Sequence, residues 1–525
     1  MHSLFAAATQ TDRRSARELQ QQWLIATALF VAALWLYTRH NDFSFYYHPD
    51  EPKKVVQIRD GTRNFNHPLL LLTVTDFARW LTGGTTDCQR IVELGRWCSA
   101  IFAAGAVALF SWLGFDRFGV IGGVTTGVAL LIQRRIYEHA HFMKEDAALL
   151  AGIALTFVAI DAVWRRPTTM RALFLGVATG VAASGKYVGL LMVPFAVAAL
   201  MGRRREAEYK PRVLLAFAGA FLVVIAAINY RALLSFGGVT AGFGGEITRL
   251  NSRSGIEVDF SRIDWLRRLL DLSPFLLILF LAHLVFAFRN LRQLRLPDLL
   301  LTAFPLLLGF MLSFSSKQSG RHVLPAMIIV AVVASFAAIR IAKELHERRA
   351  RFATPAVLTF VIAAFAYDFT GLALLDRGFQ RDHRRELVEW ITGNVPHAST
   401  IGLEERVGIP FSKPRRFCEE QSPLPQQLHG ARFAADLGTL EELRASGMTH
   451  IAVIDSHYKT FLNEGSSQVN RGDAEFLRRR EFYRRLLSEG RLVWSRETGN
   501  VGVLNPSLRL YEIAPVSGTA PATGE

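Results

Sequence analysis

Cysteine is scarce in this chain, with three residues among 525. Cys88, Cys98 and Cys418 lack the paired spacing of a metal site, and no HxxxH or HExxH pattern occurs. We therefore interpret the histidines as interfacial residues and assign no metal ligand, although a divalent ion stays open as a cofactor. Cys88 and Cys418 could pair in an oxidising compartment, but we expect three free thiols.

Motifs for binding nucleic acids and nucleotides are missing too. The net charge of +15 is not accompanied by a basic and aromatic face, so no nucleic-acid partner is expected. The glycine-rich stretch 237–245 lacks GxxxxGK[ST] and follows an apolar run instead of a strand, and we interpret it as a mobile lid. No cleavable signal is indicated, because the polar residues 1–21 lead directly into an apolar segment, which is expected to be an uncleaved anchor.

Long apolar runs separated by short basic clusters dominate the rest of the chain. Hydrophobic residues make up 50% of the sequence, which also carries 60 Lys and Arg, and the mean hydropathy is +0.22. This combination predicts a polytopic α-helical membrane protein, because helices satisfy every backbone group in lipid. We expect about 11 transmembrane helices, near 22–38, 95–113, 119–134, 147–164, 172–184, 187–201, 213–230, 273–288, 298–314, 323–340 and 355–375.

Two segments need separate interpretation. Residues 172–201 exceed one crossing, so we expect a tight reversal at residues 184–186 (SGK). Residues 69–82 are amphipathic and too short to span, so we expect them to lie along the membrane interface.

The basic clusters indicate the orientation. Most basic clusters lie in loops that follow an even number of membrane crossings, so they are on the same side of the membrane as Arg13, Arg14 and Arg17 near the N-terminus. The positive-inside rule predicts that this side is cytoplasmic. The N-terminus is then cytoplasmic, and residues 377–525 form an extracytoplasmic domain. We expect that domain to be α/β or α+β, with helices at 382–394 and 474–489 and strands at 450–454, 491–494 and 508–513.

The loops on the outer side carry a different set of charges. The candidate site residues among them are His48, Asp50, Glu51, His67, Lys144, Asp146, Lys186, Arg249, Lys317, Arg321 and His322. Carboxylates that can accept a proton, together with cations that can stabilise a phosphate oxygen, suit transfer of a group from an anionic leaving group to a hydroxyl.

Each of the main candidates also has a structural alternative. Asp50 and Glu51 could be a solvated loop pair. Lys186 could extend to the interface beside its turn. Asp146 could cap the helix that it opens.

Several motifs, in order, resemble the GT-C membrane glycosyltransferases, in particular the protein O-mannosyltransferases and the lipid A aminoarabinose transferase. The matching motifs are HPDE at 48–51, NHPL at 66–69, GRWCSAIFAAGAVALFSWLGF at 95–115, HFMKEDAALLA at 141–151, SGKYVGLLMVP at 184–194, SGRHVLPAM at 319–327, DHRRELVEWITGNVPHASTIGLEE at 382–405 and LRLYEI at 508–513. The resemblance implies a GT-C fold and the transfer of a sugar, with inversion, from a polyprenyl-phosphate carrier to a lipid, glycan or protein acceptor.

The resemblance also implies roles for individual residues. Asp50 matches the catalytic base, and Asp146 matches the acidic residue of the second loop, although Glu145 stands where relatives often have proline. Lys186 matches a cation that contacts the carrier phosphate. His67 stands where some relatives have lysine, and it is a weaker phosphate ligand at neutral pH.

The remaining assignments follow from these. Arg321 and Lys317 are expected at the donor phosphate, and His48, Lys144, His322 and Arg249 at the substrates. We expect a transmembrane catalytic domain at 1–376 in a bacterial inner membrane, with the extracytoplasmic domain at 377–525 packed on the catalytic mouth. A lipid-linked sugar transporter and a catalytically inactive lipid-binding protein are the alternative functions.

Overall fold

The chain forms a helical unit and an α/β unit, which are described separately. The computed structural model describes residues 15–44, 48, 50–202, 211–251, 263–270, 272–315, 318, 320–347, 353–410, 422–497 and 505–513. The helical unit takes in most of the chain before Leu374, and the α/β unit combines Leu374 onward with Asp42–Val56.

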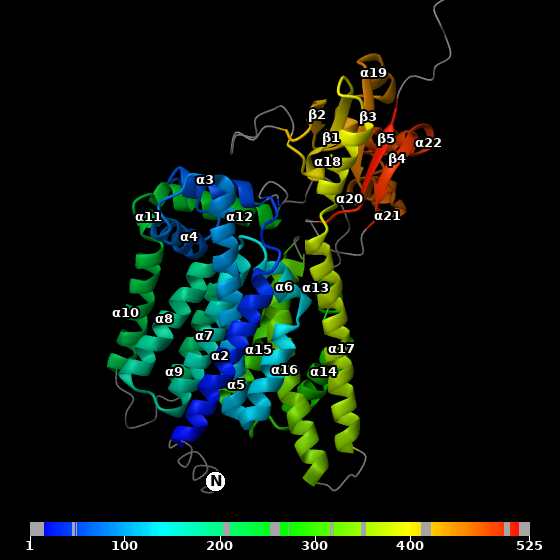
Figure 1. The fold of residues 1–525 in the computed structure, drawn as a ribbon. Coiled ribbons are helices and arrows are strands. Elements are labelled where there is room, and N and C mark those ends of the chain that lie inside the picture. Colours follow the sequence, from blue (N-terminus) through cyan, green and yellow to red (C-terminus); the bar gives the residue numbers. More distant parts are fainter. Residues whose placement is uncertain are drawn as a thin grey trace, which may run out of the picture. The chain divides into compact units, whose positions relative to one another are not determined.

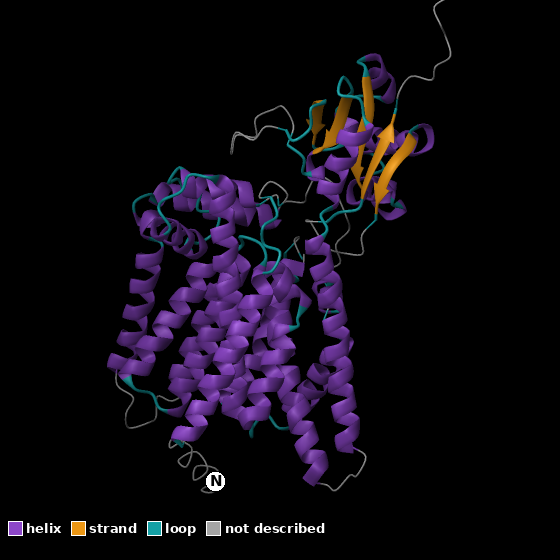
Figure 2. Ribbon diagram, viewed as in Figure 1, coloured by secondary structure: helices purple, strands orange, loops and turns teal. Residues whose placement is uncertain are grey.

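Long apolar helices make up the helical unit, and they run roughly side by side (Figures 1 and 2). They are α2 (Ala16–Thr38), α5 (Cys88–Leu131), α7 (Glu145–Arg165), α8 (Thr169–Gly185), α9 (Met192–Gly202), α10 (Pro211–Ile228), α14 (Pro274–Arg289), α15 (Leu296–Leu312), α16 (Gly320–Glu347) and α17 (Ala353–Gln380). The shorter elements are α3 (Glu51–Arg59), α4 (Leu70–Leu81), α6 (Arg134–Ala140), η2 (Tyr187–Leu191), α11 (Tyr230–Leu233), α12 (Phe236–Asn251) and α13 (Asp264–Leu269). Residues 51–56 of α3 belong to the α/β unit.

The element α5 is two helices joined by a sharp turn. Phe118 and Gly119 leave the helical conformation, and Gly119 has a φ of 64°, which glycine adopts without steric cost. The Ser111 hydroxyl donates to the Gly123 carbonyl over 2.8 Å, so the chain doubles back on itself. This turn lies at the predicted boundary between the spans 95–113 and 119–134.

The helical unit is that of a multi-pass membrane protein. In the described part of the chain, six helices are long and apolar enough to cross a bilayer. Three further apolar helices are shorter: α14, α15 and the segment formed by η2 and α9. The total of about 11 spans therefore stays a prediction. The amphipathic segment 69–82 forms α4, which lies across the ends of the long helices together with α11 and α12 (Figure 1).

The glycine-rich stretch 237–245 is helical and lies within α12, and its role as a mobile lid stays a prediction. One expectation needs correction. Cys88 is disulfide-bonded, so the expectation of three free thiols is wrong. Cys98 is free and buried, and Cys418 lies outside the described residues.

A five-stranded sheet forms the centre of the α/β unit. Its strands are β1 (Thr400–Glu404), β2 (Gln427–Ala431), β3 (Met448–Ile454), β4 (Arg491–Arg496) and β5 (Leu508–Glu512), in the order β2-β1-β3-β5-β4. The strands β2, β1 and β3 are parallel, and β5 pairs antiparallel with both β3 and β4. The helical elements around them are α18 (His383–Asn394), η3 (Glu405–Val407), η4 (Ala434–Asp436), α19 (Leu440–Ala445), α20 (Asp455–Leu462), α21 (Glu464–Val469) and α22 (Ala474–Glu489).

Alternating side chains of β3 fill a core on each face of this sheet. Ile451 and Val453 join the core that contains Phe461 of α20, whereas Ala452 joins the core that contains Leu387 of α18. This alternation is the two-residue period of a strand. The α/β class is confirmed, as are the helices 382–394 and 474–489, while β1 and β2 were not expected.

Candidate active site

Lys186 and Asp146 form a buried ion pair between two helix ends of the helical unit. The Nζ atom of Lys186 lies 2.7 Å from Oδ1 of Asp146. The side chains are only 17% and 5% exposed, so Lys186 does not extend into solvent. The α7 helix has no side-chain N-cap, and the structure therefore favours ion pairing over capping as the role of Asp146.

Gly185 explains why these two helix ends can meet. It is the last residue of α8, and a Cβ atom there would lie 2.8 Å from the backbone nitrogen of Leu149 on α7. Any larger residue would push the end of α8 away from the start of α7. The close approach places Lys186, which follows directly, beside Asp146 in the first turn of α7.

Two further basic residues surround the Asp146 carboxylate. Nδ1 of His139 on α6 lies 3.8 Å from Oδ2, which is too far for a hydrogen bond, and Lys144 is close enough to act on Asp146 electrostatically. Burial lowers the pKa of His139 below its usual value, although the Asp146 carboxylate opposes that shift. His139 is therefore neutral near pH 7, and the ammonium groups of Lys186 and Lys144 both act on the Asp146 carboxylate.

The loop that carries His67 is tied to the same region. The Tyr187 hydroxyl donates to the Phe65 carbonyl over 2.8 Å, next to Lys186. Asn229, after α10, accepts from the Leu69 backbone nitrogen over 2.8 Å and donates to the Ser184 hydroxyl over 3.0 Å. His67 itself is half-buried.

The glycine face of α12 packs on this loop. A Cβ atom at Gly242 would lie 2.7 Å from the Phe65 carbonyl oxygen, so only glycine allows this contact. Phe65 has a φ of 52°, an uncommon conformation outside glycine that the packing holds in place. Arg249 lies on α12, but its side chain is outside the described part of the structure.

The first turn of α16 lies near α6. A Cβ atom at Gly320 would be 4.0 Å from the guanidinium carbon of Arg135 on α6. Arg321 is exposed and His322 is half-buried at this helix start. Lys317, which was expected at the donor phosphate, lies outside the described residues.

His48, Asp50 and Glu51 belong to a segment of the α/β unit. The Asp50 backbone nitrogen donates to Nδ1 of His48 over 3.2 Å, and Glu51 opens α3. His48 and Glu51 are buried, whereas Asp50 is half-buried. Glu51 is therefore not part of a solvated loop pair, and Asp50 is the more accessible of the two carboxylates.

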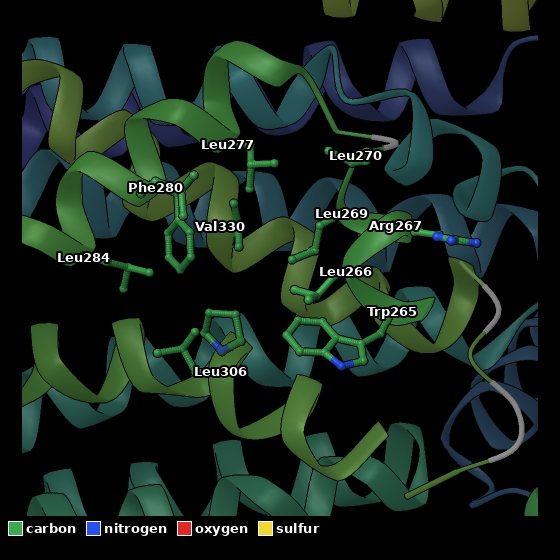
Figure 3. A pocket seen from close by; sticks show the side chains of 12 residues that line it. Trp265, Leu266, Arg267, Leu269, Leu270, Leu277, Phe280, Leu284, Leu306 and Val330 are labelled. Carbon is green, nitrogen blue, oxygen red and sulfur yellow. The ribbon is translucent and has the colours of Figure 1, made fainter. Parts of the chain in front are cut away.

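An apolar pocket of about 360 Å³ lies between α13, α14, α15 and α16. Trp265 and Phe280 face the same space, while Arg267 points away from it (Figure 3). Trp265 is held by Gln318, whose Oε1 accepts from the Trp265 backbone nitrogen over 2.7 Å. The pocket suits a hydrocarbon chain.

Some residues of the site were not expected from the sequence. Asn229 links the loop at 64–69 to Ser184, and a polar residue at the end of an apolar run was the available signal. The position of His139 beside Asp146 depends on the fold of α6. Within the described ranges, no group of three or more His, Cys, Asp or Glu could hold a metal ion.

Solved structures of similar fold are known, although no protein-family model and no curated protein matches the sequence. The chain is similar to ArnT from Cupriavidus metallidurans bound to undecaprenyl phosphate, with a TM-score of 0.52 and 13% identity over 94% of this chain and 99% of that chain. The apo state of ArnT gives a TM-score of 0.50 with 13% identity over 93% and 98%. These similarities confirm the expected GT-C fold.

Proposed function

We propose that this protein is an integral-membrane glycosyltransferase that moves a sugar from a polyprenyl-phosphate carrier to an acceptor. The buried pair of Lys186 with Asp146 carries this proposal. A buried ammonium group held by a single carboxylate keeps further hydrogen-bonding capacity for an incoming phosphate. The fold supports the same donor, because the ArnT structure of that fold contains undecaprenyl phosphate.

The reaction is a single displacement at the anomeric carbon. Asp50 removes the proton from the acceptor hydroxyl, whose oxygen attacks the anomeric carbon while the bond to the carrier phosphate breaks. The carrier leaves as polyprenyl phosphate, and one displacement inverts the anomeric configuration. Glu51 orients the loop that carries Asp50, and Asp146 positions Lys186.

Cations assist the departure of the carrier. Lys186 and Arg321 stabilise the negative charge that grows on the phosphate oxygen, with His67 and Lys317 as further ligands. His48, Lys144, His322 and Arg249 contact the substrates. The apolar pocket beneath Trp265 takes part of the prenyl chain, since its lining is hydrocarbon and aromatic.

The site faces the extracytoplasmic side. Disulfides persist in oxidising compartments, and Cys88, which is disulfide-bonded, opens α5. The distribution of basic clusters in the sequence supports the same orientation. In a bacterium this places the active site at the outer surface of the inner membrane.

An assay of carrier release tests the proposal. Purified protein in detergent is incubated with a polyprenyl-phosphate sugar and an extract of envelope lipids and glycans, and polyprenyl phosphate is measured. We expect acceptor-dependent release. A transporter or an inactive lipid-binding protein would leave the donor intact, so absence of release in every acceptor fraction would contradict the proposal.

A further inference from the structure

A second group of charges lies far from the candidate active site, at the other end of α7. Asp161 is about 22 Å along α7 from Asp146. The group joins the turn of α5, the end of α7 and the start of α15, and we call it the α5–α7–α15 charge cluster. Its members are Asp116, Arg117, Asp161, Arg165, Arg295 and Asp298.

Each of the three aspartates in this cluster forms an ion pair with at least one arginine. Arg117, whose side chain is 6% exposed, lies 2.5 Å from Asp161 and 2.9 Å from Asp298. Arg165 pairs with Asp116 and Asp161. The network is held tightly, because removing one partner would leave a buried charge uncompensated.

Arg340 of α16 stands beside the cluster without an ion pair among the described residues. Its guanidinium carbon lies 4.7 Å from the centre of the Phe286 ring on α14, and its Nη1 is buried with no hydrogen-bond partner. Asp298, Arg295 and Arg117 act on it electrostatically. With Arg340 included, the described residues of this region supply four arginines to three aspartates, and Arg340 is the arginine that has no ion pair among them.

Nearby, His283 of α14 has a ring nitrogen that accepts no hydrogen bond from the described residues. The Thr302 hydroxyl donates to the Asp298 carbonyl, so it accepts from Nε2 of His283, 3.0 Å away. In the neutral ring, Nδ1 is then an acceptor, and it is buried with no partner in the described chain. Arg340 is close enough to act on His283 electrostatically.

The position of Arg340 along α16 indicates its depth in the membrane. Arg340 lies about 30 Å along α16 from Gly320, which matches the thickness of the hydrocarbon core. It is therefore at the level where lipid headgroups begin. On neighbouring α14, Leu281, Val285 and Phe288 are 53%, 55% and 81% exposed, as expected for side chains that contact lipid, and they lie on the face of α14 opposite His283.

We propose that Arg340 binds the phosphate of an anionic phospholipid in this leaflet. The phosphate balances the positive charge of Arg340, and the acyl chains extend into the surrounding lipid. A headgroup with hydroxyl donors also suits the open acceptor of His283, so phosphatidylglycerol is the probe of choice. The site is separate from the catalytic chemistry, and the proposal does not depend on the proposed function.

Lipid binding to the full chain tests this inference. Delipidated protein in neutral detergent is titrated with phosphatidylglycerol, phosphatidylcholine or inorganic phosphate, and bound lipid is counted by native mass spectrometry. We expect one tightly bound phosphatidylglycerol, weaker binding of phosphatidylcholine and no displacement by millimolar phosphate. Equal affinity for the two lipids, or displacement by phosphate, would overturn the proposal.

A matched pair of variants locates the site. Arg340→Gln should weaken phosphatidylglycerol binding by about tenfold, the effect of one charge-assisted contact. Arg292→Gln removes the same charge from a nearby exposed position and should bind like wild type. Equal affinity in wild type and both variants, or equal weakening in both variants, would overturn the assignment to Arg340. Should Arg340→Gln not fold, the comparison of lipids on the wild-type chain still decides.

Discussion

At the residue scale, the ion pair of Lys186 with Asp146 is the main support for the proposed phosphate site. Both residues were expected from their motifs, but they are separated by 40 positions, and nothing in the sequence shows that they pair. The pairing depends on the approach of α8 to α7. It also changes what a substitution at Lys186 is expected to do.

Replacing Lys186 with alanine should lower both donor affinity and stability. Loss of one buried charge-assisted contact to phosphate costs about 2–3 kcal/mol, or roughly 30- to 150-fold in affinity. The same change removes the ion-pair partner of buried Asp146 and leaves Lys144 as the remaining ammonium group near it, so the loss of unfolding free energy should stay below the roughly 3–5 kcal/mol of a fully uncompensated buried charge. Binding of a polyprenyl-phosphate donor and thermal unfolding measure the two effects.

A double variant separates these effects. Lys186→Ala with Asp146→Asn removes the unpaired charge, so stability should largely return while donor affinity stays low. Recovery of donor affinity together with stability would mean that Lys186 acts only through folding.

Asp50 is the second prediction at this scale. Asp50→Asn keeps the shape of the side chain but cannot accept a proton, so turnover should fall by about a hundredfold or more while donor binding persists. Glu51→Gln should lose less activity, because Glu51 is buried and orients the loop. The idea fails if Asp50→Asn turns over near the wild-type rate, or if it loses donor binding and activity together.

At the element scale, glycines decide where helices meet. Gly185→Ala places a Cβ atom against α7 and should cost about 1–3 kcal/mol of unfolding free energy, with weaker donor binding as Lys186 moves. Gly219→Ala on α10 is the matched control, since a Cβ atom there meets nothing within 4 Å. Thermal unfolding of the two variants in the same detergent makes the comparison, and equal stability would contradict the packing argument.

Element positions were predictable where the local signal was strong. Apolar length indicated the long helices, and Gly119 lies where the chain was expected to turn. β1 and β2 were missed because the runs TIGLE and QLHGA are short and do not alternate clearly, and their pairing depends on distant strands. The helical state of α12 was missed because glycine disfavours helices locally, whereas contact with Phe65 requires glycine there.

At the scale of the whole molecule, the orientation remains a prediction that labelling can test. Single cysteines at residues 53 and 420 should react with an impermeant reagent from outside, and those at residues 204 and 348 should not. Lys53 is exposed on α3, whereas the other three positions lie outside the described residues. Labelling of residue 204 from outside would contradict the assigned spans.

The whole-chain fold could be inferred from the order of weak motifs and confirmed by the similarity to ArnT. The division into a transmembrane catalytic domain at 1–376 and an extracytoplasmic domain at 377–525 remains a proposal. The disulfide at Cys88 could not be inferred, because three cysteines permit several pairings and none has a diagnostic spacing.

The most direct test of the central claim measures both products of one reaction. Purified protein is incubated with a polyprenyl-phosphate sugar of known anomeric configuration and an acceptor fraction that supports release. Polyprenyl phosphate is quantified, and the new glycosidic linkage is assigned by NMR. We expect equal amounts of polyprenyl phosphate and glycosylated acceptor, with the linkage inverted. Retained configuration, or glycosylation without polyprenyl phosphate, would contradict single displacement from a lipid-phosphate donor.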